Sequence, residues 1–165
     1  HRFYAIDPES GKRITYKQKG LREKLLCREC EKRIGVFEDY ASKFFQGGIG
    51  FWIQAQGQEQ KITGINYKLF KLFFLSVFWR ASVSDLDFFD KVKMQKINEN
   101  IIRDMLKKGD PGKTESYPFI MITSFLRHQA LLDLIVKPDK IYVEGHRCFR
   151  FVFNGIFWIF FESRI

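Results

Sequence analysis

The chain has 165 residues, enough for a hydrophobic core, and we expect a single α+β domain over residues 1–165. Its hydrophobic content of 45% and its 19 Phe exclude an intrinsically disordered chain. Its formal net charge of +9 favours partners such as nucleic-acid phosphates, although a basic surface without any ligand is the alternative.

The first fifth of the chain is predicted to form a β-hairpin followed by a short strand. Phe3–Ile6 and Arg13–Lys17 are β-prone runs on either side of a turn that contains Pro8 and Gly11. Leu21–Leu26 is predicted to be a short strand that leads to a pair of cysteines.

A change of hydrophobic period then predicts an amphipathic helix from Glu31 to the glycines at 47 and 48. Its apolar positions have helical spacing, at Ile34, Phe37, Ala41 and Phe44. Cys30 should lie at the start of this helix, with Cys27 just before it. The helix dipole and the free amide groups there favour a thiolate over a thiol.

Two further helices and two strands are expected in the middle of the chain. Phe51–Gln56 and Lys61–Ile65 are predicted strands on either side of Gly57. Tyr67–Ser82 is apolar on nearly every face, which is typical of a central core helix. The run is too short for a membrane span, which needs about 20 apolar residues. Residues 97–108 carry the pattern of a second amphipathic helix.

The C-terminal part is predicted to be mostly β. Tyr117–Thr123 is a predicted strand, and the secondary structure of Phe125–Val136 is ambiguous. Arg147–Phe153 and Ile156–Phe161 flank Asn154-Gly155, a turn pair that adopts positive φ readily and so predicts a hairpin. Within the first of these strands, phenylalanines alternate onto one face and Cys148 onto the other.

The spacing Cys27-Arg28-Glu29-Cys30 is that of two thiolates that chelate one tetrahedral zinc ion. A closed structural site needs four such ligands, and the rest of the sequence has no second C-x-x-C or H-x-x-x-H pair. The pair therefore predicts half of a structural zinc site. A redox dithiol and two free structural thiols are the alternatives.

The positive charge is concentrated before and around this pair. Residues 1–33 carry ten Lys and Arg against five acidic residues, so they hold +5 of the net charge of +9. We expect the nucleic-acid contacts on the basic residues that precede the cysteines. These are Lys12, Arg13, Lys17, Lys19, Arg22 and Lys24.

Other candidate groups favour structural roles. The lone histidines His128 and His146 have no partner ligand at a recognisable spacing, and Cys148 should be packed on its strand. His1 differs, because as the first residue it could belong to a motif that continues upstream. Glu31, Glu38 and Asp39 could hold Mg²⁺ or act as acid and base, but a solvated helix face is our interpretation. No catalytic residue is assigned from the sequence.

Several stretches of the chain resemble a family of uncharacterised bacterial HNH-endonuclease-like proteins. They are Lys24–Glu31, Phe37–Ala41, Tyr67–Phe73, Phe78–Ser84 and Asp110-Pro111-Gly112. The resemblance implies a treble-clef zinc site in which Cys27 and Cys30 are the second ligand pair. It places a treble-clef-like remnant in residues 1–48, and a helical core with C-terminal strands in residues 49–165.

The resemblance also implies an activity that these residues do not complete. Family members typically carry an earlier C-x-x-C pair and a histidine motif, and neither occurs in the 165 residues. Either both lie upstream of His1, where the sequence starts without an initiator Met, or the chain is a degenerate member of the family. The histidine would activate water, and a bound Mg²⁺ or Mn²⁺ would stabilise the charge that develops on the phosphate.

The leading hypothesis is a nucleic-acid-binding, HNH-nuclease-like protein, and the resemblance suggests a role in bacterial anti-phage defence. The alternative is a non-catalytic module that binds another protein, or a subunit of a larger complex. No membrane partner is expected. Three cysteines without a disulfide framework point to a reducing cytoplasm.

Overall fold

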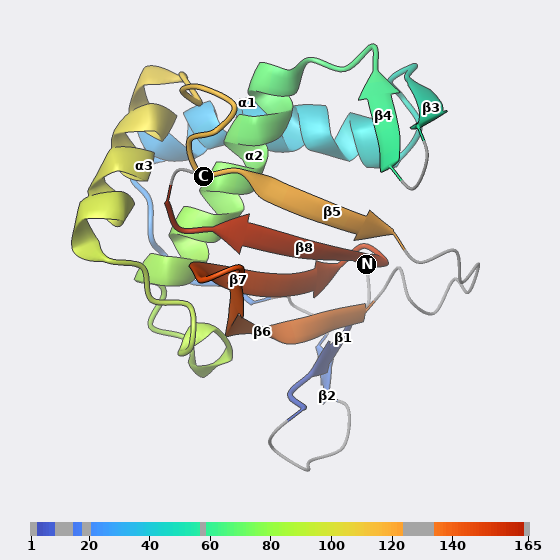
Figure 1. Cartoon of the computed structure of the whole chain (residues 1–165). Helices are drawn as coiled ribbons and strands as arrows, with labels where there is room; N and C mark the ends of the chain where they lie inside the picture. The colour runs from blue at the N-terminus through green and yellow to red at the C-terminus, as the bar shows by residue number, and fades with distance from the viewer. Residues whose placement is uncertain (1–2, 9–14, 18–20, 57–58, 124–133, 164–165) are drawn as a thin grey trace. The chain divides into compact units, whose positions relative to one another are not determined.

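The structure, a computed structural model, describes residues 3–8, 15–17, 21–56, 59–123 and 134–163 (Figure 1). The chain divides into two compact units. The first unit consists of His1–Leu25, Arg80–Asn100 and Lys113–Ile165, and the second consists of Leu26–Trp79 and Ile101–Gly112.

A mixed sheet forms the first unit, and within the described residues it has six strands in the order β2-β1-β6-β7-β8-β5 (Figure 1). The strands are β1 (Phe3–Ile6), β2 (Thr15–Lys17), β5 (Phe119–Thr123), β6 (Leu134–Val143), β7 (His146–Phe153) and β8 (Ile156–Phe161). β1 runs antiparallel to β2, which confirms the predicted N-terminal hairpin, and parallel to β6. All other neighbouring strands of the sheet are antiparallel.

The predicted C-terminal hairpin is confirmed. Asn154 and Gly155 join β7 to β8 with φ angles of 53° and 70°, the left-handed values that a two-residue hairpin turn of this kind requires. Cross-strand partners share a face of the sheet, so the pairs Phe149–Phe160 and Phe151–Trp158 form one aromatic layer. Cys148 lies on the opposite face and is fully buried, as expected.

The predicted strand at Leu21–Leu26 is wrong, because this stretch is irregular and pairs with no strand among the described residues. Its exposure nevertheless alternates: Arg22 and Lys24 are exposed, whereas Leu21, Glu23 and Leu25 are partly buried. Such alternation arises in any extended chain that lies on a surface, whereas a strand also needs a partner for its backbone hydrogen bonds.

The second unit is built on helices. Its elements are α1 (Arg28–Phe45), the hairpin of β3 (Trp52–Gln56) and β4 (Glu59–Thr63), most of α2 (Tyr67–Val83) and the C-terminal half of α3 (Lys96–Lys108). The buried residues of α1 are Ile34, Phe37, Ala41 and Phe44, the four positions that the periodicity predicts. α3 ends at Gly109, whose φ is 64°.

Aromatic rings fill the interior of the second unit. The Phe44 ring lies 4.8 Å from those of Phe51 and Phe70, and the Phe70 ring lies 4.9 Å from that of Phe74. Asn66 caps α2, since its Oδ1 accepts a hydrogen bond of 3.2 Å from the Leu69 amide. The described residues thus form an α+β fold, and no helix among them is long and apolar enough to cross a membrane.

Candidate metal half-site and basic segment

Cys27 and Cys30 lie at the N-terminus of α1, in the second unit. Cys27 is the N-cap residue, with an extended backbone, and its Sγ accepts a hydrogen bond of 3.5 Å from the Cys30 amide. Its carbonyl oxygen accepts the first helical hydrogen bond, from the Glu31 amide at 2.9 Å. Cys27 is exposed and Cys30 is partly exposed, so a ligand can reach both sulfur atoms.

The local hydrogen bonds shift the pKa values of the two thiols in opposite directions. The pKa of Cys27 is lowered, because the Cys30 amide and then the Cys30 thiol donate hydrogen bonds that stabilise its thiolate. The pKa of Cys30 is raised, because its thiol donates to Cys27 and is partly desolvated. Cys27 is therefore the more acidic thiol of the pair. A metal ion bound by both sulfur atoms would release the Cys30 proton.

The cysteine pair offers two sulfur ligands, and no further metal ligand joins them among the described residues. The described part of the chain contains no group of three or more His, Cys, Asp or Glu side chains that could hold a metal ion. Cys148 is fully buried on β7, and the His146 ring packs 6.2 Å from the Phe161 ring. His1 and His128 lie outside the described residues.

Two chemistries fit this pair of sulfurs. One is metal binding, in which the pair occupies two corners of a tetrahedral zinc site. The other is dithiol chemistry, since an exposed thiol of lowered pKa beside a second thiol at a helix N-terminus is also the arrangement from which a disulfide forms. Both uses rely on the same feature, the hydrogen bond from the Cys30 amide to Sγ of Cys27.

The acidic residues of α1 form no site of their own among the described residues. Glu31 is exposed in the first turn, where its charge complements the helix dipole. Oδ2 of Asp39 lies 3.5 Å from Nζ of Lys43, one helical turn later. This face carries the ordinary surface ion pairs of a solvated helix, as expected.

The structure describes part of the predicted nucleic-acid-binding set. Lys12, Arg13 and Lys19 lie outside the described residues, and Lys17 is described only as a backbone position of β2. Arg22 and Lys24 are both exposed, in the first unit. We call residues 21–25 the basic segment.

Glu23, the one acid of the basic segment, is partly buried and hydrogen-bonded. Its Oε2 accepts a hydrogen bond of 2.5 Å from the Ser84 hydroxyl, and its Oε1 accepts one of 3.0 Å from the Asp85 amide. These two bonds, the one from Ser84 first, lower the pKa of Glu23 and keep it ionised. Glu23 thus keeps its negative charge but bonds to the protein, whereas Arg22 and Lys24 are exposed.

The residues that bond to Glu23 belong to the loop after α2, and no sequence pattern predicts this contact. The Lys93 ammonium donates to the carbonyl oxygens of Ser82 at 3.3 Å and Ser84 at 2.6 Å, and the Ser82 hydroxyl accepts from the Met94 amide at 3.0 Å. These bonds hold the loop after α2 in one conformation. Ser84 lies 61 residues after Glu23, so no local pattern in the sequence joins them.

A second group of basic residues lies in the second unit, near the cysteine pair. The Arg33 guanidinium donates a hydrogen bond of 2.6 Å to the Lys107 carbonyl oxygen, which joins the first turns of α1 to the last turn of α3. Arg28, Lys32, Lys107 and Lys108 are exposed at these two helix ends. The sequence predicts Lys107 and Lys108 only as helix-end residues, because the contact of this helix end with Arg33 joins residues 74 positions apart.

Comparison with known proteins finds no match: no protein-family model, no curated protein and no solved structure matches this chain.

Proposed function

We propose that this protein binds nucleic acid, and that the basic segment is part of the surface that contacts the phosphates. The observation that carries the proposal is the fixed position of Glu23, whose carboxylate bonds to Ser84 and Asp85. A free glutamate between Arg22 and Lys24 would repel a phosphate. With Glu23 held by the protein, the two exposed cations can approach the backbone of a nucleic acid.

The proposal includes a structural zinc ion at Cys27 and Cys30, in a treble-clef-like corner. The donor set supports it: the two thiols have zinc-ligand spacing, and the pKa of Cys27 is lowered by the hydrogen bond from the Cys30 amide. Two further ligands would have to come from outside the described residues or from another molecule. Such a zinc ion would hold the start of α1 in place and would take no part in catalysis.

The proposed catalytic role depends on groups beyond those described. With a histidine motif and Mg²⁺ or Mn²⁺, an HNH-like assembly hydrolyses phosphodiester bonds, and the resemblance places this activity in bacterial anti-phage defence. By this proposal the chain itself contributes the binding surface and the zinc half-site, works in the cytoplasm, and is inactive as a nuclease without the missing motif.

Binding as a function of salt tests the proposal. The whole chain is titrated into labelled DNA and RNA oligonucleotides, single- and double-stranded, and the dissociation constant is measured by fluorescence anisotropy. We expect affinity to fall steeply between about 50 and 200 mM salt, because each neutralised phosphate releases counterions. No binding to any of them at low salt would refute the proposal and favour the non-catalytic protein-binding module.

A further inference from the structure

The β3–β4 hairpin of the second unit exposes a large aromatic side chain. Trp52, the first residue of β3, is 68% exposed, more than any other large apolar residue that the structure describes. A single exposed apolar residue is common on protein surfaces, so the setting of the indole decides whether it can serve a ligand.

The Trp52 ring is seated on a glycine. A Cβ atom added to Gly64 would come within 3.0 Å of Cζ3 and 3.1 Å of Cε3 of Trp52, so only a glycine lets the ring lie this close. Gly64 also has a φ of 86°, which disfavours any replacement. The six-membered ring thus packs on the backbone after β4, and the orientation of the exposed indole is set before any ligand arrives.

The strand register gives the Trp52 side of the hairpin a polar character. Trp52 pairs with Thr63 and Gln54 pairs with Lys61, so these four side chains project from one face. Gln54 and Lys61 are exposed like the indole. Ile53 and its partner Ile62 project from the opposite face. We call the face of Trp52, Gln54, Lys61 and Thr63 the tryptophan face.

We propose that the tryptophan face binds single-stranded nucleic acid, with one base stacked on the Trp52 indole and a neighbouring phosphate held by the Lys61 ammonium. The inference rests on the proposed function and narrows its ligand from nucleic acid in general to unpaired strands. Diagonal neighbours on an antiparallel pair lie about 7–8 Å apart, a distance that a lysine side chain can bridge.

The side chains of the tryptophan face favour single-stranded nucleic acid over a duplex or a protein as the ligand. A base inside a duplex is covered by its neighbours on both sides, so an indole can stack only on an unpaired base. A protein-docking surface would present several apolar residues together, whereas here one indole is bordered by an amide, a hydroxyl and an ammonium group. The net charge of +9 adds a general attraction for polyanions.

The test compares matched variants on one probe, a thymidine homopolymer oligonucleotide, with a duplex of equal length as the reference. Affinities are measured by anisotropy at low salt for the wild type, Trp52→Ala, Trp52→Phe, Lys61→Gln and the control Ile53→Ala. The control is well matched, because Ile53 is 53% exposed on the opposite face of the same strand.

We expect the single strand to bind more tightly than the duplex. Trp52→Ala should weaken single-strand binding about tenfold, and Trp52→Phe should restore most of the loss, because loss of one base–aromatic stack costs about 1–3 kcal/mol. Lys61→Gln should lower the salt dependence by about one phosphate contact. Ile53→Ala should bind like the wild type.

A second measurement reports on the ring itself. The oligonucleotide should quench the tryptophan emission of the wild type, and Trp52→Phe should remove most of the quenching, since Trp158 is fully buried and Trp79 is partly buried. The inference is overturned, and the proposed function stands, if the chain binds nucleic acid but Trp52→Ala matches the wild type. It is also overturned if Ile53→Ala loses as much affinity, since binding would then not depend on the tryptophan face. Both proposals fail if neither probe binds.

Discussion

The Ser84 hydroxyl donates a hydrogen bond of 2.5 Å to Oε2 of Glu23, and Oε1 of the same carboxylate accepts the Asp85 amide at 3.0 Å. This contact joins the basic segment to the loop after α2 within the first unit. It directs the ionised Glu23 carboxylate towards Ser84 and Asp85, while Arg22 and Lys24 on either side are exposed. This contact therefore fixes both the path of the segment and the side on which its carboxylate lies.

Glu23 should make folding stability depend on pH. Its hydrogen bonds from Ser84 and Asp85 hold its pKa in the folded chain below the ordinary value of a glutamate, so its contribution is fully present above the unfolded pKa and is lost as the pH falls through the folded pKa. Melting temperatures measured between about pH 6 and 3 should therefore fall more for the wild type than for Glu23→Gln. Equal pH profiles for the two proteins would contradict the assignment.

The two thiols of the half-site should react in a fixed order. Cys27 has the lowered pKa and Cys30 the raised one, so iodoacetamide at neutral pH should modify Cys27 first. Cys148 is fully buried and should stay unmodified until the chain unfolds. The order can be read by peptide mass spectrometry over a time course. Prior addition of zinc should protect both Cys27 and Cys30 if the pair is a metal half-site.

The Arg33 bond to the Lys107 carbonyl oxygen should stabilise the second unit. Arg33→Ala removes a charge-assisted hydrogen bond, and we expect a loss of about 1–2 kcal/mol in the free energy of unfolding, measured by urea titration. Arg103→Ala, an exposed arginine of the same unit, should change stability by less than about 0.5 kcal/mol. Equal effects of the two variants would exclude a structural role for the Arg33 bond.

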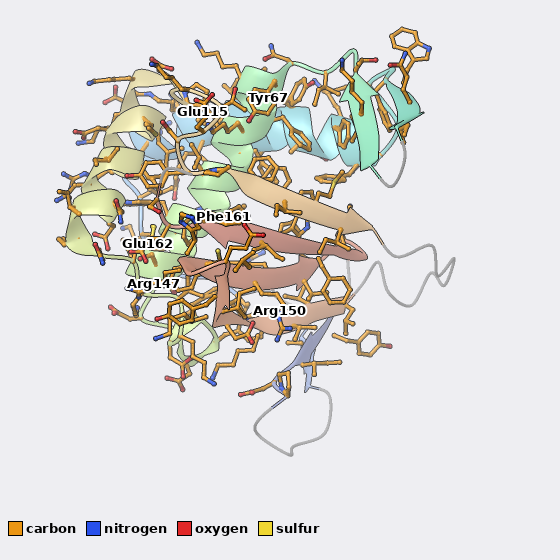
Figure 2. The ribbon with its side chains drawn as sticks, viewed as in Figure 1. Tyr67, Glu115, Arg147, Arg150, Phe161 and Glu162 are labelled. Atoms are coloured by element: carbon orange, nitrogen blue, oxygen red, sulfur yellow. The ribbon has the colours of Figure 1, made fainter. Side chains whose placement is uncertain are left out.

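Two arginines of β7 offer a comparison of a buried and a surface ion pair (Figure 2). Nε of Arg147 lies 3.0 Å from Oε2 of Glu162, whose side chain is only 3% exposed, although the two atoms do not meet hydrogen-bond geometry. Arg147 also donates to the Lys93 carbonyl oxygen at 2.5 Å. Arg150 makes two hydrogen bonds to Asp139, of 3.0 and 2.6 Å, at the surface.

Arg147→Ala should destabilise the chain far more than Arg150→Ala. The first leaves the buried Glu162 carboxylate without its countercharge, at a cost of about 3 kcal/mol. The second removes a surface pair worth about 0–1 kcal/mol. Thermal and chemical denaturation of the two variants measures the difference. Glu162→Gln in the Arg147→Ala background should recover part of the loss.

Local patterns in the sequence predict much of the secondary structure. The spacing of Ile34, Phe37, Ala41 and Phe44 gives the buried face of α1, because a helix repeats every 3.6 residues whatever it packs against. Asn154-Gly155 gives the turn between β7 and β8, because few other residue pairs adopt positive φ at both positions so readily. Both signals lie within a few residues of the element that they specify.

The remaining features depend on distant partners. The sequence has no local mark of the parallel pairing of β1 with β6, or of the loop that receives Glu23. Leu21–Leu26 has the alternation of a strand and lacks the strand that would pair with it. For the candidate site, spacing locates Cys27 and Cys30 at the start of a helix, but any further ligands would come from other parts of the fold or another molecule.

The decisive measurement is how nucleic-acid binding depends on salt when the positive charges of the basic segment are removed. It tests whether this segment contacts phosphates. Arg22→Gln/Lys24→Gln is compared with the control Arg103→Gln/Lys140→Gln, which also removes one exposed arginine and one exposed lysine. If the basic segment contacts phosphates, only the first variant should bind more weakly. Its plot of log affinity against log salt concentration should also be shallower, by the slope that about two phosphate contacts contribute. Equal slopes for both variants and the wild type would contradict such contacts.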